Sequence, residues 1–159
     1  MNICVKNVID EDFVNYKKAS MFVAFPNCSF KCEKECGKKM CQNSNLAKQP
    51  SIDISAADVV KKYLSNPITH ALVCGGLEPF DSSYDLLELV TEFRKESEDT
   101  IVIYTGYMPE EISGQLDQLR RFRNIIVKFG RFVPDSESHF DSLLGVNLAS
   151  SNQYAERIS

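Results

Sequence analysis

The sequence predicts a single α/β domain in which helices cross over between the strands of a parallel sheet. Short apolar segments alternate along the chain with segments whose apolar residues recur at helical spacing. No repeat, low-complexity run or linker divides the 159 residues. The composition, 43% hydrophobic and 25% charged, is ordinary for a soluble globular domain of this size. We therefore expect one domain over residues 1–159, with residues 1–19 as an N-terminal extension.

The first core strand is predicted over residues 20–25, because this segment is short, apolar and followed by Pro26. Residues 26–49 follow as a long polar loop without sustained periodicity. Loops of that length inside a compact domain are usually functional. Ser55 then predicts the N-cap of a helix over about residues 56–64.

The rest of the chain continues the same alternation. In order, we predict a strand over residues 70–74, a helix over 83–95, a strand over 100–104, a helix from Pro109 to Phe122, a strand over 124–129 and a strand over 145–149. Turns containing glycine follow two of these strands, at Gly75-Gly76 and at Thr105-Gly106. Ligands of parallel sheets gather at the carboxyl ends of the strands. We therefore expect the loop at residues 26–49 and both turns to converge on one site.

The charge of the chain argues against two classes of partner. Its formal net charge is −4 and its pI is near 5.2, whereas nucleic acids and membrane surfaces attract concentrated positive charge. The N-terminus lacks the pattern of a secretory signal, and no run approaches the roughly 20 apolar residues that span a bilayer. We expect a cytoplasmic protein, in which clustered cysteines bind metal or do chemistry instead of forming disulfides.

Four of the six cysteines crowd into one segment: Cys28, Cys32, Cys36 and Cys41. Cys4 and Cys74 stand apart, and Cys74 is expected to pack inside its strand. Clustered thiolates bind either a structural zinc ion or an iron–sulfur cluster, and spacing alone leaves both open. A structural zinc site usually takes its ligands from two separated pairs, but His70 and His139 are isolated. This difference favours a cluster.

Two parts of this segment carry a family resemblance. Residues 28–32, Cys-Ser-Phe-Lys-Cys, directly follow a predicted strand, and residues 41–43 are Cys-Gln-Asn. Together they resemble the cluster loop of radical S-adenosylmethionine enzymes. The loop looks most like that of the activating proteins of anaerobic (class III) ribonucleotide reductases. The usual family spacing is C-x3-C-x2-C, from which this loop departs after Cys32.

Cys28 and Cys32 fit the family spacing, so the third cluster ligand is the open question. Cys41 is favoured, with an insertion before it, because the Gln-Asn behind it resembles the residues after the third cysteine of the family. Cys36 is the alternative third ligand. In the favoured assignment, Met40 occupies the position of the apolar residue that packs near the adenine.

The later turns resemble further motifs of the same family. Residues 74–79, Cys-Gly-Gly-Leu-Glu-Pro, are similar to a Gly-Gly-Glu-Pro motif that holds the methionine amino group, with Leu77 as an extra residue. Residues 104–107, Tyr-Thr-Gly-Tyr, and residues 149–153, Ala-Ser-Ser-Asn-Gln, also resemble segments of the activating proteins. Taken singly, each turn also fits ordinary strand-exit chemistry. The resemblance implies cofactor contacts from Gly75, Gly76, Glu78, Thr105, Gly106, Ser151 and Asn152.

We interpret the whole as an incomplete parallel (β/α) barrel, with the cluster loop after the first core strand. The resemblance implies a 4Fe–4S cluster whose open iron binds S-adenosylmethionine, and a radical that removes a hydrogen from a glycine of a large partner subunit. Anaerobic ribonucleoside-triphosphate reductase is the expected partner, and a reducing flavodoxin or ferredoxin is the expected electron donor. Because the chemistry belongs to the cofactors, no side chain is assigned as a catalytic acid or base.

Two other functions stay open at this point. The first is a different radical S-adenosylmethionine enzyme that acts on a peptide or a small molecule, and the second is a non-catalytic metal-binding interaction module. Both the activating enzyme and a different radical enzyme would produce 5′-deoxyadenosine, whereas the non-catalytic module would not.

Overall fold

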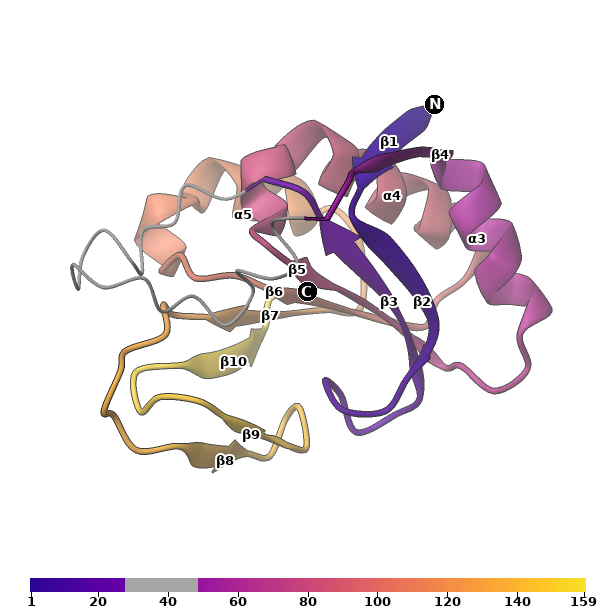
Figure 1. Cartoon of the computed structure of the whole chain (residues 1–159). Coiled ribbons are helices and arrows are strands. Elements are labelled where there is room, and N and C mark those ends of the chain that lie inside the picture. Colours follow the sequence, from indigo (N-terminus) through magenta and orange to yellow (C-terminus); the bar gives the residue numbers. More distant parts are fainter. Residues whose placement is uncertain (28–48) are drawn as a thin grey trace.

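The computed structural model describes residues 1–27 and 49–159. A six-stranded mixed sheet forms its centre, with the strand order β10-β7-β6-β5-β3-β2 (Figure 1). The chain is therefore a mixed α/β domain, as predicted. The four predicted candidate ligands and Met40 belong to residues 28–48 and lie outside the described residues.

Four parallel strands form the middle of the sheet, and they confirm the four predicted core strands. They are β3 (Ser20–Phe25), β5 (Ala71–Gly76), β6 (Thr100–Tyr104) and β7 (Ile125–Phe129). Both faces of these strands are covered, which explains why each reads as a nearly continuous apolar run. An antiparallel strand flanks the group on each side: β2 (Asn7–Asp12) beside β3 and β10 (Tyr154–Arg157) beside β7.

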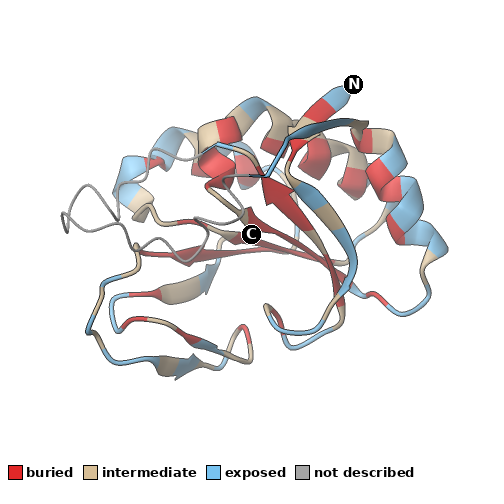
Figure 2. Cartoon of the chain, viewed as in Figure 1, coloured by how far each residue is buried: buried red, intermediate tan, exposed pale blue. Residues whose placement is uncertain are grey.

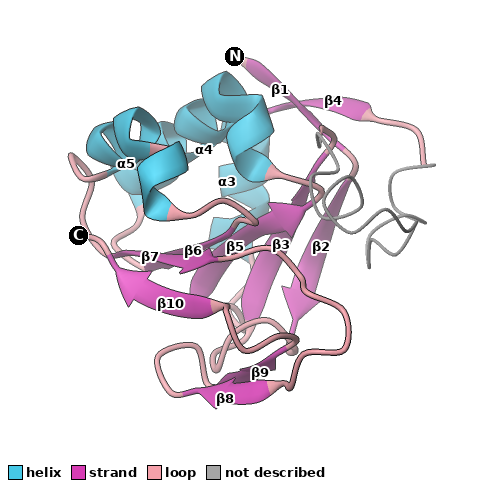
Figure 3. Cartoon of the chain, turned by 90° about the vertical axis from the view of Figure 1, so that its left-hand side faces the viewer, coloured by secondary structure: helices cyan, strands magenta, loops and turns pink. Residues whose placement is uncertain are grey.

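Within residues 1–27 and 49–159, three α-helices cover one face of the sheet: α3 (Ala56–Ser65), α4 (Ser83–Glu96) and α5 (Ser113–Leu119) (Figures 1 and 3). The start of α3 is as predicted, since the Ser55 hydroxyl accepts a hydrogen bond of 3.4 Å from the Asp58 N–H. The larger core cluster joins these helices to the sheet. Of the helices that the structure describes, none has the length and apolar character to cross a membrane.

The single helix predicted from Pro109 to Phe122 is wrong in two respects, because the structure divides it and ends its second part at Leu119. A 3₁₀ helix, η2 (Pro109–Glu111), precedes α5. Between them, Ile112 has φ −130° and ψ 30°, outside helical geometry, and its side chain is only 2% exposed. The apolar periodicity continues across this residue, so the sequence pattern does not reveal the break.

The opposite face of the sheet is covered by a two-stranded antiparallel sheet of β8 (His139–Asp141) and β9 (Val146–Leu148). The strand predicted over residues 145–149 is β9, and it pairs with β8 instead of the main sheet. A second, smaller core cluster lies on this face and includes Tyr16 and Leu144. Figure 2 shows the buried residues concentrated in the central strands and on the inner sides of the helices.

Residues 1–19, for which the sequence analysis predicts no element, contribute to two sheets. Strand β1 (Asn2–Val5) pairs antiparallel with β4 (Ile52–Ser55), and this pair lies on the helical side of the main sheet (Figure 1). Strand β2 then joins the main sheet at one edge. Strand pairing therefore fixes the chain on both sheets before β3 begins.

Candidate functional site

Glu78 joins the carboxyl ends of β5 and β6. Its side-chain Oε1 accepts a hydrogen bond from the Gly106 N–H (2.8 Å), and its Oε2 accepts bonds from the Thr105 hydroxyl (2.9 Å) and the Phe80 N–H (3.1 Å). Glu78 is only 6% exposed. The structure thus brings together the two turns that the sequence predicts to converge.

The environment of Glu78 changes its acidity. Burial raises the pKa of this carboxyl to about 7, since an ionised carboxylate loses its hydration there. The donors from Gly106, Phe80 and Thr105 act in the opposite direction, because they stabilise the ionised form, and the nearby Asp81 raises the pKa slightly further. The group therefore exchanges its proton near neutral pH.

The glycines before Glu78 are required by a close approach between β5 and β3. Gly76 has φ +85°, in the left-handed region, and a Cβ on it would lie 2.8 Å from the Cα of Ala24. A Cβ on Gly75 would lie 3.0 Å from the ring of Phe22. These two positions let the end of β5 press against β3, from which the cysteine-rich segment begins.

The entry to the cysteine-rich segment is fixed to the same turn. Asn27, the last described residue before Cys28, accepts a hydrogen bond at its backbone carbonyl from the Glu78 N–H (2.8 Å). Its side-chain amide also donates to the hydroxyl of Ser82 (3.0 Å). Just before this contact, the Leu77 N–H donates to the carbonyl of Phe25 (3.2 Å), the last residue of β3. The cysteine-rich segment, which contains the predicted ligands, therefore begins next to Glu78.

Tyr107 extends the site to β7. Its hydroxyl donates to Asp81 Oδ1 (2.5 Å), its N–H donates to the Thr105 hydroxyl (3.0 Å), and its carbonyl accepts a bond from the Gly130 N–H (3.2 Å). The guanidinium of Arg131 lies 5.7 Å from the centre of its ring. The ends of three parallel strands are thus joined by one continuous set of polar contacts.

The two C-terminal candidates differ in position. The Asn152 side-chain amide donates to the carbonyl of Arg131 (2.9 Å), directly after β7, so Asn152 borders the site. The Ser151 hydroxyl is within hydrogen-bonding distance of the Ser136 hydroxyl (2.8 Å), and its N–H donates to the same hydroxyl (2.9 Å). Ser151 is exposed and its described contacts belong to the loop before β8.

Sequence reasoning missed Lys128, although a charged residue inside an apolar strand is a visible signal. Lys128 is 6% exposed, donates to the carbonyl of Gly130 (3.1 Å), and lies 5.6 Å from the ring centre of Tyr104. It also missed Asp81 and the bridging role of Tyr107, because a hydrogen bond across 26 residues leaves no local pattern. These three residues sit beside the predicted ones.

The predicted metal ligands all lie in residues 28–48, outside the described residues. Within residues 1–27 and 49–159 there is no group of three or more His, Cys, Asp or Glu side chains able to bind a metal ion. Cys74 is fully buried in the core between sheet and helices, as expected for a strand residue. Burial raises the pKa of its thiol to about 12, which disfavours the thiolate.

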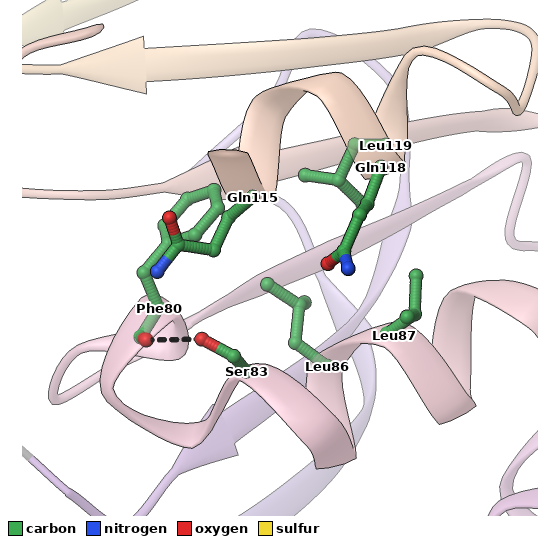
Figure 4. Close-up of a pocket in the computed structure, with 7 residues that line it drawn as sticks. All are labelled: Phe80, Ser83, Leu86, Leu87, Gln115, Gln118 and Leu119. Atoms are coloured by element: carbon green, nitrogen blue, oxygen red, sulfur yellow. Dashed lines mark hydrogen bonds between the residues drawn. The ribbon is translucent and has the colours of Figure 1, made fainter. Parts of the chain in front are cut away.

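A small pocket lies on the helical side, between α4 and α5 (Figure 4). Two of its lining residues are joined by a hydrogen bond, which the Ser83 hydroxyl donates to the carbonyl of Phe80 (2.6 Å). The lining is apolar apart from this hydroxyl and two amides: Phe80, Ser83, Leu86, Leu87, Gln115, Gln118 and Leu119. It offers no charged group, so the strand ends remain the candidate site.

Fold and site together define an α/β protein whose cysteine-rich segment begins at the carboxyl ends of its parallel strands. A family model described as a 4Fe–4S single cluster domain matches residues 17–154, which is most of the chain. The chain belongs to this 4Fe–4S single cluster domain family. A comparison with curated proteins finds no match. The family indicates a 4Fe–4S cluster, which decides between the two metal centres that the cysteine spacing leaves open.

Proposed function

We propose that the chain activates a glycyl-radical enzyme by cleaving S-adenosylmethionine reductively and removing a hydrogen from a glycine of its partner. The expected partner is anaerobic ribonucleoside-triphosphate reductase, with a flavodoxin or ferredoxin as electron donor. One observation carries the proposal: in a chain of a 4Fe–4S family, Asn27 leads into the cysteine-rich segment from hydrogen-bonding contact with the Gly75-to-Glu78 turn. The resemblance assigns that turn to S-adenosylmethionine.

The proposed cluster ligands are Cys28, Cys32 and Cys41, with Cys36 as the alternative third ligand. Clustered thiolates suit iron–sulfur ligation, and three of them leave one coordination position for a substrate. When bound, the cluster supplies the electron that breaks a carbon–sulfur bond of S-adenosylmethionine. Met40 is proposed to pack near the adenine.

The described residues are proposed to hold the ligand at the strand ends. Gly75 and Gly76 let the end of β5 lie directly against Phe22 and Ala24 of β3, which keeps this turn next to the start of the cysteine-rich segment. Thr105 and Gly106 are held next to this turn by the hydrogen bonds that they donate to the Glu78 carboxylate. Asn152 lies at the edge of the site next to β7, where its side-chain amide donates to the carbonyl of Arg131.

The finer fold assignment fits the same function. We propose that the parallel strands form an incomplete barrel, whose open side lets a loop of the partner protein reach the site. Clustered cysteines that bind a metal cluster instead of forming disulfides suit a reducing compartment, and we propose the cytoplasm as the location of the protein.

Anaerobic reconstitution tests the function in three steps. Iron and labile sulfide should both reach about four per chain, the EPR spectrum of the reduced cluster should shift on addition of S-adenosylmethionine, and dithionite should then yield 5′-deoxyadenosine. Addition of the reductase should produce a glycyl-radical doublet. Glu137→Gln, in an exposed position before β8, is a suitable control variant.

Each step excludes a different alternative. Stoichiometric zinc without sulfide would contradict the cluster itself. A complete cluster without 5′-deoxyadenosine would indicate a non-catalytic cluster-binding module. Formation of 5′-deoxyadenosine without a glycyl doublet would indicate a radical enzyme that acts on another peptide or on a small molecule.

A further inference from the structure

The carboxylate of Glu78 is already occupied by its own chain. Three donors reach it from Phe80, Thr105 and Gly106, and a carboxylate offers about four acceptor positions. The Phe80 bond also makes Glu78 the N-cap of the 3₁₀ helix η1 (Pro79–Ser82). Little acceptor capacity is left for a ligand.

The direction of this carboxylate follows from the extra residue before it. Leu77 takes the position directly after Gly76, and its N–H continues the pairing with Phe25 (3.2 Å). Glu78 is therefore the second residue beyond the strand, where its backbone N–H donates to the Asn27 carbonyl and its side chain turns towards Gly106. At 6% exposure, the side chain faces protein.

We propose that the side chain of Glu78 is a positioning group, which holds the ends of β5 and β6 together beside Asn27 and the start of the cysteine-rich segment, instead of contacting the amino group of the ligand. The inference deepens the proposed function and rests on it wherever a ligand is involved. It differs from the role that the family resemblance gives to this glutamate.

Hydrogen exchange on the cluster-loaded chain without ligand tests the structural part. In Glu78→Ala, the amides of Gly106 and Phe80 lose their acceptor, so both should exchange at least about tenfold faster than in the native chain. Amides of α3 should keep their rates, and Glu137→Gln should change neither set. Unchanged exchange at Gly106 and Phe80 would overturn the inference.

Equilibrium binding tests the positioning part. The dissociation constants of S-adenosylmethionine and of the same sulfonium lacking the α-amino group are compared in the native chain and in Glu78→Gln. Positioning predicts that both constants rise about tenfold and that their ratio stays within about twofold. Glu78→Gln keeps one carbonyl acceptor, so its defects should be smaller than those of Glu78→Ala.

The other binding outcomes are equally decisive. Loss of the preference for the amino group in Glu78→Gln would show direct contact and overturn the inference. Unchanged constants for both ligands would show a purely structural role and also overturn it. If the native chain binds neither ligand, the proposed function fails, and the exchange rates alone decide whether Glu78 holds the two strand ends together.

Discussion

Glu78 places a proton-exchanging group inside the protein, and this has a measurable effect on stability. Its pKa of about 7 in the folded chain lies above the ordinary value of 4.5. The folded state thus binds this proton more tightly than the unfolded state does. The resulting stabilisation is complete below pH 4.5 and is lost as the pH rises through about 7.

We therefore predict that Glu78→Gln flattens the pH dependence of stability between about pH 5 and pH 8. In the native chain, ionisation of Glu78 should cost up to about 3 kcal/mol over this range. Thermal unfolding followed by circular dichroism measures it, with Glu137→Gln as the control. Equal slopes in the native chain and Glu78→Gln would contradict the raised pKa.

Gly76 and Gly114 form a second matched pair at the scale of single residues. Gly76→Ala should destabilise the chain by about 1–3 kcal/mol, because φ is +85° and the new Cβ would lie 2.8 Å from the Cα of Ala24. Gly114→Ala meets nothing within 4 Å in α5 and should be neutral or stabilising by up to about 1 kcal/mol. Melting temperatures that fail to separate the two variants would contradict the close approach of β5 to β3.

At the scale of elements, the N-cap of α3 gives a test that is independent of the site. Ser55→Ala removes the acceptor for the Asp58 N–H and should cost about 1 kcal/mol. Ser51→Ala, at an exposed position outside any element, should cost little. Urea denaturation compares the two, and an equal loss in both would mean that Ser55 does not cap the helix.

The sequence predicts some elements better than others, for physical reasons. Strands β3, β5, β6 and β7 are covered on both faces, so their apolar runs are unmistakable. Strand β2, Asn-Val-Ile-Asp-Glu-Asp, is mostly exposed, and its membership in the sheet depends on pairing with β3, a non-local contact. The same holds for β10, which pairs with β7 from residues that are half-exposed or exposed.

For the molecule as a whole, the convergence of the two glycine-containing turns was predictable from the sequence, and the contacts between them were not. The order of the motifs along a parallel sheet places Gly76 and Thr105 at one edge. That Glu78 closes the gap between them depends on burial and on the extra Leu77. Neither is visible in a local pattern.

The choice of the third cluster ligand is also a question about the whole molecule. We predict that Cys41→Ala abolishes assembly of the 4Fe–4S cluster, whereas Cys36→Ala retains it. Cys41 is the proposed third ligand, so its loss leaves an iron without its thiolate, and the loss of Cys36 does not. Iron and sulfide analysis after anaerobic reconstitution measures this. Loss of the cluster in Cys36→Ala alone would reverse the assignment and leave the proposed function standing.

The acidity of β2 has a consequence for solubility. Within the described chain, β2 ends the strand order, and an edge strand offers unpaired backbone groups to any extended segment nearby. Asp10 and Glu11 are exposed there, next to Asp12. If the β2 edges of two copies met, these carboxylates would come close together, and their repulsion would disfavour a dimer formed through this strand.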